Sequence, residues 1–197
     1  MFSIGNNTAR DITLKDINVS VYQSAKQLVA QPHRALLRTL LRRHSLFGGR
    51  DAEIKQLDTF ADASSGYLFL TGASGFGKTA LLANWIRSRD ANEKETVYHF
   101  ISTLDDTATE ETVLRSLCQQ VLDFHLIHDL LPLGTGALRS IYVDLLNRPI
   151  STGRKLVVVL DALDEASGWL VTSGLFPIPL PESVCQRSHS PRWCSSC

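Results

Sequence analysis

Gly72-Ala73-Ser74-Gly75-Phe76-Gly77-Lys78-Thr79 is the most informative stretch of this sequence. It follows the pattern G-x-x-x-x-G-K-T, in which glycines let the backbone approach a phosphate group and successive N–H groups point at it. The pattern predicts that Lys78 reaches the phosphate oxygens and that the Thr79 hydroxyl ligates Mg²⁺. The residues expected to contact a nucleotide here are Gly72, Ala73, Ser74, Gly75, Phe76, Gly77, Lys78, Thr79 and Ala80.

The flanking residues supply the context that this motif requires. Residues 67–71 are apolar and rich in aromatic side chains, which predicts a buried strand. Residues 79–89 have a helical pattern with basic residues at the end. A strand, a glycine-rich loop and a helix in this order favour a phosphate-binding loop over an ordinary turn.

A second apolar stretch ends in acidic side chains. Residues 155–165 read K-L-V-V-V-L-D-A-L-D-E, and such a continuous apolar run predicts a central parallel strand buried on both faces. Asp161 is the predicted Mg²⁺ ligand beside Thr79. Asp164 and Glu165 are candidates to orient or activate an attacking water, and with Lys78 they form the predicted catalytic set. The alternative is a buried strand followed by a solvated acidic turn.

Composition limits the possible classes of protein. The chain has 197 residues, of which 44% are hydrophobic and 20% charged, and its net charge is zero. These values predict one folded domain with appendages and argue against a global electrostatic footprint for nucleic acid. No apolar run approaches 18 residues, and residues 1–10 lack the apolar core of a signal peptide. We therefore expect a cytoplasmic protein without a membrane span.

The sequence predicts that residues 1–45 form an N-terminal extension and linker helix. Polar and apolar side chains alternate briefly in residues 11–21, as in a short strand. Residues 22–46 have a helical pattern with a break near Pro32. Arg34, Arg38 and Arg42 share one face of that helix. This face is either solvated or a contact for nucleic acid or membrane, and the solvated interpretation is favoured.

Further elements are expected between the loop and the acidic strand. The sequence predicts a helix from residue 51 to about 63, a strand at 96–101 and a helix at 137–146. Thr107 and Glu110 fit a capping box at the start of a helix that continues to about residue 124.

Three segments together resemble the NACHT-type or closely related STAND-class NTPases of the AAA+ superfamily. Residues 46–53 are similar to the family segment F-x-G-R-x-x-E, which lies against the adenine and ribose and which adds Gly49 and Arg50 to the expected nucleotide-binding residues. Residues 72–79 are similar to the Walker A loop, and residues 156–165 to Walker B. The resemblance spans residues 46–181.

The resemblance implies an α/β fold, the three-layer α/β/α P-loop NTPase domain with a parallel sheet. It implies binding of ATP or GTP with Mg²⁺ and slow hydrolysis as a signal-transduction switch, with self-association or a partner protein bound through the NTPase domain. An arginine finger is not assigned; Arg139, Arg148 and Arg154 are candidates by residue type alone.

The C-terminal residues depart from the family pattern. The family places a further strand between the phosphate-loop strand and the acidic strand, whereas residues 182–197 read as an irregular tail rich in Cys and Ser, without a strand period. We expect a sheet that is incomplete at the C-terminus, as in a truncated or frame-shifted product. In an alternative interpretation Cys185, His189, Cys194 and Cys197 ligate zinc.

Two other functions compete with the hydrolysing switch. The chain could bind nucleotide without turnover and act as a scaffold fragment. It could also be a nucleic-acid-acting AAA-like ATPase, for which Arg34, Arg38 and Arg42 are the only support and against which the neutral charge counts. A small-molecule kinase is disfavoured because no arginine-bearing lid is found.

Overall fold

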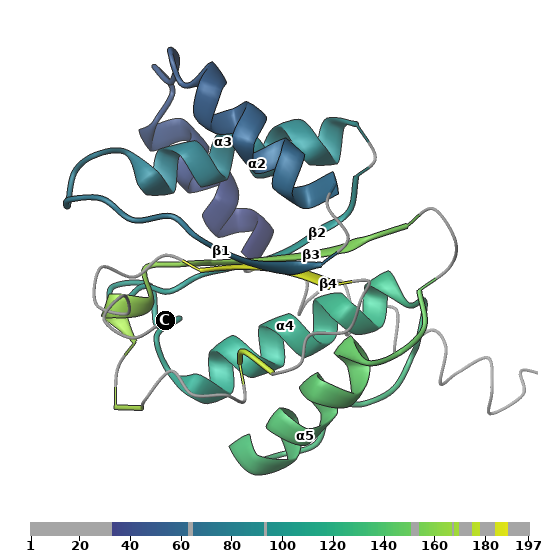
Figure 1. Cartoon of the computed structure of the whole chain (residues 1–197). Helices are drawn as coiled ribbons and strands as arrows, with labels where there is room; N and C mark the ends of the chain where they lie inside the picture. Colours follow the sequence, from purple (N-terminus) through teal and green to yellow (C-terminus); the bar gives the residue numbers. More distant parts are fainter. Residues whose placement is uncertain are drawn as a thin grey trace, which may run out of the picture.

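Four parallel strands form one sheet between two layers of helices (Figure 1). The computed structural model describes residues 33–62, 65–92, 94–150, 154–166, 168–169, 175–177 and, for the backbone, 184–188. Helices α2 (Asp51–Asp62) and α3 (Lys78–Ala91) cover one face, and α4 (Glu110–Phe124) and α5 (Thr135–Leu146) cover the other. The predicted three-layer α/β/α architecture with a parallel sheet is confirmed.

The strand order places the two predicted motif strands one strand apart. The sheet has the order β1-β4-β3-β2, where β1 is Gly66–Phe69, β4 is Val184–Ser188, β3 is Leu156–Asp161 and β2 is Thr96–Phe100. All six residues of β3 are buried, as the continuous apolar run predicted. The strands expected near residues 67–71, 96–101 and 155–165 are thus confirmed with slightly different ends. The burial predicted for the first of them is wrong, because β1 is an edge strand of the sheet: three of its residues are half-buried and Phe69 is exposed.

The predicted gap in the sheet is wrong. β4 pairs with β1 through Gly66 and Cys185, and with β3 through Leu156 and Val184, so the place between the phosphate-loop strand and the acidic strand is filled. The tail expected to be irregular from residue 182 therefore contains a strand. Its sequence, V-C-Q-R-S, has no apolar alternation; the backbone hydrogen bonds of a strand paired on both sides do not require one.

The side chains of β3 build two hydrophobic cores because successive residues of a strand point to opposite faces. Val157 and Val159 pack with the α2 and α3 layer, whose buried side chains include Trp85. Val158 and Leu160 pack with α4 and α5. Residues 33–43 are helical and add to the first core through Leu37 and Leu40.

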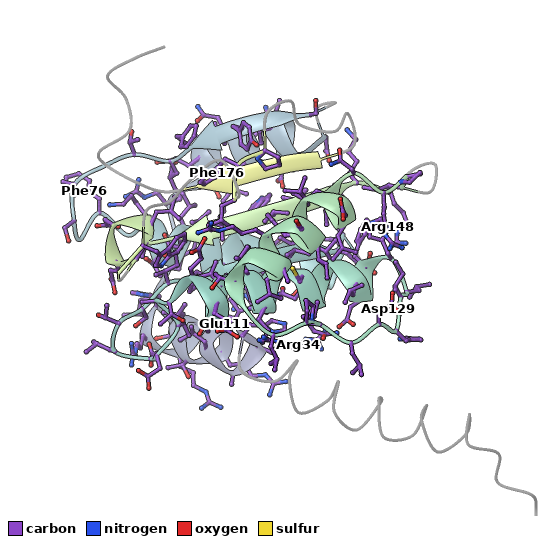
Figure 2. The ribbon with its side chains drawn as sticks, turned by 90° about the horizontal axis from the view of Figure 1, so that it is seen from below. Arg34, Phe76, Glu111, Asp129, Arg148 and Phe176 are labelled. Atoms are coloured by element: carbon purple, nitrogen blue, oxygen red, sulfur yellow. The ribbon has the colours of Figure 1, made fainter. Side chains whose placement is uncertain are left out.

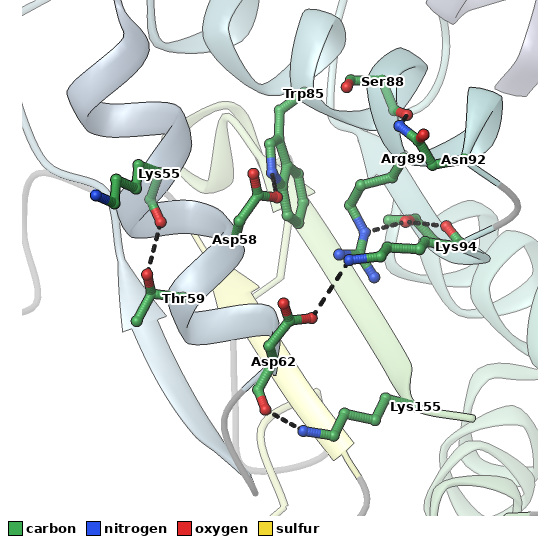
Figure 3. A network of polar contacts seen from close by, with 11 residues as sticks. Lys55, Asp58, Thr59, Asp62, Trp85, Ser88, Arg89, Asn92, Lys94 and Lys155 are labelled. Atoms are coloured by element: carbon green, nitrogen blue, oxygen red, sulfur yellow. Dashed lines mark hydrogen bonds and ion pairs between the residues drawn. The ribbon is translucent and has the colours of Figure 1, made fainter. Parts of the chain in front are cut away.

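Polar contacts fix α2 to its neighbours (Figure 3). The indole N–H of Trp85 in α3 donates to the Asp58 carboxylate at 2.8 Å. At the end of α2, the Asp62 carboxylate lies 3.7 Å from the Lys94 ammonium, and the Lys155 ammonium donates to the Asp62 carbonyl. These contacts hold α2 against α3 and the sheet, and so position the residues that precede α2.

The predicted capping box at the start of α4 is wrong. The helix begins at Glu110, and its N-cap is Thr109, whose hydroxyl accepts a hydrogen bond from the Thr112 N–H at 3.3 Å. The Thr107 hydroxyl instead donates to the Phe100 carbonyl at 2.8 Å and closes the turn that follows β2. Either threonine could cap the helix by residue type, but the hydroxyl of Thr107 is bonded to the end of β2, so Thr109 caps the helix.

Other N-terminal predictions lie partly outside the described residues. The short strand predicted at 11–21 and the predicted helical residues before residue 33 lie outside the described residues. The three arginines predicted to share a helix face, Arg34, Arg38 and Arg42, are exposed. Within the described residues no helix is both long and apolar enough to cross a membrane.

Candidate functional site

The glycine-rich loop runs from the end of β1 to the start of α3. Residues 71–77 are exposed, and the Phe76 N–H donates to the Ala73 carbonyl at 3.4 Å, which closes a turn at the tip. Gly75 and Gly77 have φ values of +80° and +78°. These left-handed conformations favour glycine over other residues and explain two of the motif positions.

Lys78 folds back over this loop. Its ammonium donates to the carbonyls of Gly72 and Ala73, at 2.8 and 2.7 Å. Both acceptors lie at the start of the loop, so the positive charge is held within the curve of the backbone. Residues from the two ends of the motif therefore meet around one ammonium group.

The N-terminus of α3 is suited to an anion. Its N-cap, Gly77, has no side chain to cap the helix, and the first turn contains no acidic residue. The first helical hydrogen bond runs from the Leu81 N–H to the Gly77 carbonyl at 2.9 Å, so the N–H groups of residues 78–80 precede the helical ladder. These donors, the helix dipole and the Lys78 ammonium together fit a phosphate group.

The acidic strand ends at the same edge of the sheet. Because parallel strands align their carboxyl ends, β1 and β3 place the loop and Asp161 at one edge with only β4 between them, a separation of about 10 Å between strand axes. Asp161 is 1% exposed, and Thr79 is half-buried at the start of α3. A hydroxyl and a carboxylate are oxygen donors of the kind that Mg²⁺ prefers, so these residue types fit the cation.

A strained residue redirects the chain after Asp161. Ala162 has φ +57° and ψ +46°, a left-handed conformation that is unfavourable for a residue with a side chain. It ends β3 and starts a 3₁₀ turn, η1 (Leu163–Glu165), in which Leu163 is buried. Asp164 and Glu165 are left exposed, and the Glu165 carboxylate accepts a long hydrogen bond of 3.4 Å from the Thr103 N–H.

Arg50, the residue before α2, contacts the loop. The Arg50 guanidinium donates to the Phe76 carbonyl at 3.0 Å and to the Glu53 carboxylate at 2.8 Å. Gly49, with φ +72°, precedes it in a left-handed turn. The structure therefore brings Arg50 to the glycine-rich loop, and Gly49 is its neighbour in the sequence. Sequence reasoning missed the contribution of Glu53, although its i, i+3 spacing from Arg50 indicates a pair on one helix face.

The candidate arginines lie elsewhere. Arg139 forms a bidentate pair with Glu110, at 2.5 and 2.6 Å, and Arg154 donates to the Glu95 carboxylate and the Phe124 carbonyl. Figure 2 shows Arg148 and the loop residue Phe76 at opposite ends of the molecule. The structure thus brings none of the three to the loop of its own chain.

Two cavities in the described part of the chain lie away from the loop. A cavity of about 470 Å³ and another of about 450 Å³ follow the outer edge of β2, and His33 lines both. The first has Arg34 and Arg38 on one wall and the carboxylates of Asp90 and Asp123 among its other residues. Residues 71–77 of the loop are exposed, and the assignment of the loop depends on its backbone geometry.

The predicted zinc ligands are largely untested. Cys185 lies in β4, whereas His189, Cys194 and Cys197 lie outside the described residues. The described part of the chain contains no group of three or more His, Cys, Asp or Glu residues that could hold a metal ion.

A parallel sheet with a glycine-rich loop between β1 and α3, and with an acidic strand one position away, defines a P-loop NTPase-like fold. The chain belongs to the family described as "Nephrocystin 3, N-terminal", whose model matches residues 50–176.

A solved structure described as Cdc6p from Pyrobaculum aerophilum has a TM-score of 0.45 with this chain at 14% sequence identity. The match covers 71% of this chain and 38% of that chain. No curated protein matches the sequence significantly.

Proposed function

We propose that this chain binds ATP or GTP with Mg²⁺ at the loop of residues 72–79 and hydrolyses it as a STAND-type signal-transduction switch in the cytoplasm. The observation that carries the proposal is the Lys78 ammonium, held at 2.8 and 2.7 Å from the carbonyls of Gly72 and Ala73. It lies in a glycine loop that leads into a helix N-terminus without a side-chain cap. Such an arrangement attracts and orients a polyphosphate.

In this proposal the loop, Lys78, Thr79 and Asp161 have separate roles. The N–H groups of the loop bind phosphate oxygens, and Lys78 exchanges its two backbone carbonyls for phosphate oxygens. Thr79 and Asp161 hold the metal ion from α3 and β3. When bound, Mg²⁺ offsets the negative charge of the phosphate oxygens, which favours attack on phosphorus.

Turnover requires a group that holds the attacking water. Asp164 and Glu165 are exposed immediately after Asp161 at the carboxyl edge of the sheet, where such a group is needed. Glu165 is the better candidate because the Thr103 N–H already orients its carboxylate. Without turnover the same site would serve a nucleotide-binding scaffold, and a hydrolysis assay separates the two functions.

Thermal unfolding with Mg²⁺–ATP and with Mg²⁺–GTP tests the binding proposal. A ligand that binds only the folded state at one hundred times its Kd stabilises that state by about 2.7 kcal/mol. We expect a rise in the unfolding temperature of the parent chain that Lys78→Ala abolishes. Lys55→Ala, which removes an exposed ammonium from α2, is the matched control and should respond like the parent. A parent chain that responds to neither nucleotide would overturn the proposal.

The nucleic-acid alternative has one supporting observation, the exposure of Arg34, Arg38 and Arg42 on residues 33–43. The acidic residues opposite Arg34 and Arg38 in the neighbouring cavity reduce the positive potential of that face. DNA binding that weakens steeply with salt and is lost when the three arginines are replaced would favour this alternative.

A further inference from the structure

The contact between Arg50 and the Phe76 carbonyl fixes the orientation of one peptide group in the glycine-rich loop. A trans peptide is planar, so its C=O and N–H bonds point in opposite directions. Because the Phe76 carbonyl points to the Arg50 guanidinium at 3.0 Å, the Gly77 N–H of the same peptide points away from Arg50. The orientation of this donor therefore depends on a side chain 26 residues earlier in the chain.

The local backbone offers little resistance to rotation of this peptide. Rotation changes ψ of Phe76 and φ of Gly77, and glycine populates positive and negative φ almost equally. Gly77 has φ +78°, and a β-carbon built there would meet no atom within 4 Å. Neither a side chain nor packing around the Gly77 α-carbon therefore restrains its φ angle. Phe76 is 66% exposed at the rim of the molecule (Figure 2). An external contact is therefore needed to hold a single orientation.

Glu53 in turn orients Arg50. Its carboxylate accepts from the second guanidinium nitrogen at 2.8 Å, and this hydrogen bond lowers the pKa of Glu53. Glu53 lies in the first turn of α2, which the Asp58–Trp85 and Asp62–Lys94 contacts hold in place. The guanidinium is thus fixed between a rigid helix and the tip of the loop.

We propose that Arg50, held by Glu53, is a positioning residue that orients the Phe76–Gly77 peptide so that the Gly77 N–H serves as a phosphate donor. This inference rests on the proposed function, and it differs from the role implied by the family resemblance, in which this segment lies against the base and ribose. It assigns Arg50 to the phosphate loop and gives Glu53 an indirect role in binding.

Calorimetric titration with two probes, Mg²⁺–ATP and Mg²⁺–tripolyphosphate, tests the assignment. Tripolyphosphate has no base or ribose, so Arg50→Ala should weaken the binding of both probes by a similar factor, about tenfold, which is typical of one lost hydrogen bond to a charged group. A loss confined to ATP would mean that Arg50 contacts the base or ribose and would overturn the proposal.

The Glu53→Gln and Glu53→Ala variants distinguish a positioning role of Arg50 from direct phosphate binding. The two roles predict opposite changes in affinity when the Glu53 charge is removed. If Arg50 bound phosphate directly, removal of the Glu53 charge would free the guanidinium and reduce repulsion, so affinity would rise. The positioning role predicts that Glu53→Ala lowers affinity for both probes and that Glu53→Gln, whose amide oxygen can still accept from Arg50, retains most of it. Asp51→Asn removes a charge from the same helical turn and is the matched control.

Hydrogen exchange without ligand separates failure of this inference from failure of the proposed function. Loop peptides that contain residues 73–80 should exchange faster in Arg50→Ala and Glu53→Ala than in the parent, at unchanged unfolding temperature. If the parent binds neither probe, the proposed function fails and so does the phosphate-donor role. If the parent binds both probes but exchange and affinity are unchanged in the two variants, only the positioning role fails.

Discussion

The side-chain amide of Gln120 in α4 pairs with both backbone polar groups of Tyr98 in β2. The Tyr98 N–H donates to the amide oxygen at 3.1 Å, and the amide NH₂ donates to the Tyr98 carbonyl at 2.9 Å. Since β2 pairs with β3 on its other side, Gln120 occupies hydrogen-bonding positions that a further strand would use. Exposed edge strands invite pairing with other chains, and this contact blocks the middle of β2.

Replacement of Gln120 should therefore destabilise the fold and open the edge. In Gln120→Leu both Tyr98 groups lose their side-chain partner, and we expect the free energy of unfolding to fall by about 2 kcal/mol. Urea unfolding measures this loss, and size-exclusion chromatography reports self-association through β2. Gln119→Leu, one position away and half-buried, should change neither quantity appreciably. An unfolding free energy and an association state that stay unchanged in Gln120→Leu would mean that the edge contact is dispensable.

The stability of the fold should decrease in mild acid. Burial lowers the pKa of His33 to about 4 from its usual value near 6.5, with the neighbouring Arg34 charge adding to the effect, and burial also lowers the pKa of His99. Between pH 6.5 and 4 the unfolded chain binds more protons than the folded chain. The free energy of unfolding therefore falls as pH falls through this window.

The contribution of His33 can be isolated with a variant that does not titrate. His33→Phe keeps an aromatic ring against Tyr98, where the ring centroids lie 5.3 Å apart at 74°. Urea unfolding at pH 7 and at pH 4.5 measures how far the free energy of unfolding falls between the two pH values. This fall should be smaller in His33→Phe than in the parent by roughly 1 kcal/mol, a value reduced for the partial exposure of the site. The exposed His128→Phe should behave like the parent. A pH dependence unchanged by His33→Phe would assign the loss to other groups.

Asp161 should govern the metal dependence of nucleotide binding. Asp161→Asn keeps the shape of the side chain but removes the charge that holds the cation, so the stabilisation by nucleotide should no longer depend on Mg²⁺. Unfolding temperatures measured with ATP in the presence of Mg²⁺ or of a chelator test this expectation. Asp144→Asn, on an exposed position of α5, is the control. Persistence of the full Mg²⁺ effect in Asp161→Asn would remove this residue from the metal site.

The two acidic residues of η1 should differ in their effect on turnover. Glu165→Gln retains an acceptor for the Thr103 N–H, so nucleotide binding should be unchanged while phosphate release falls about 100-fold, as expected for loss of a general base. Asp164→Asn should have a much smaller effect. A phosphate-release assay under saturating nucleotide, with binding measured separately, compares the two variants. The reverse order would assign the water-holding role to Asp164.

Local sequence was sufficient to predict the elements with a strong pattern. Residues 72–79 and the apolar run before Asp161 carry their signal within a dozen positions, because glycine, lysine and an unbroken Val/Leu run limit the backbone directly. The α/β class and the helices α2, α3 and α5 follow from the same short-range patterns. The start of α4 was predicted too early in the sequence because Thr107 and Thr109 are chemically equivalent N-caps. Only contacts with the neighbouring end of β2 distinguish the two threonines.

Contacts between distant residues account for what the amino-acid pattern did not reveal. β4 has no apolar period and becomes a strand because β1 and β3 present open hydrogen-bonding edges on both of its sides. Arg50 meets Phe76, and Gln120 meets Tyr98, across 26 and 22 residues. Composition and periodicity report which backbone conformations a segment favours, whereas backbone pairing and side-chain contacts depend on which partners the completed fold brings within hydrogen-bonding distance.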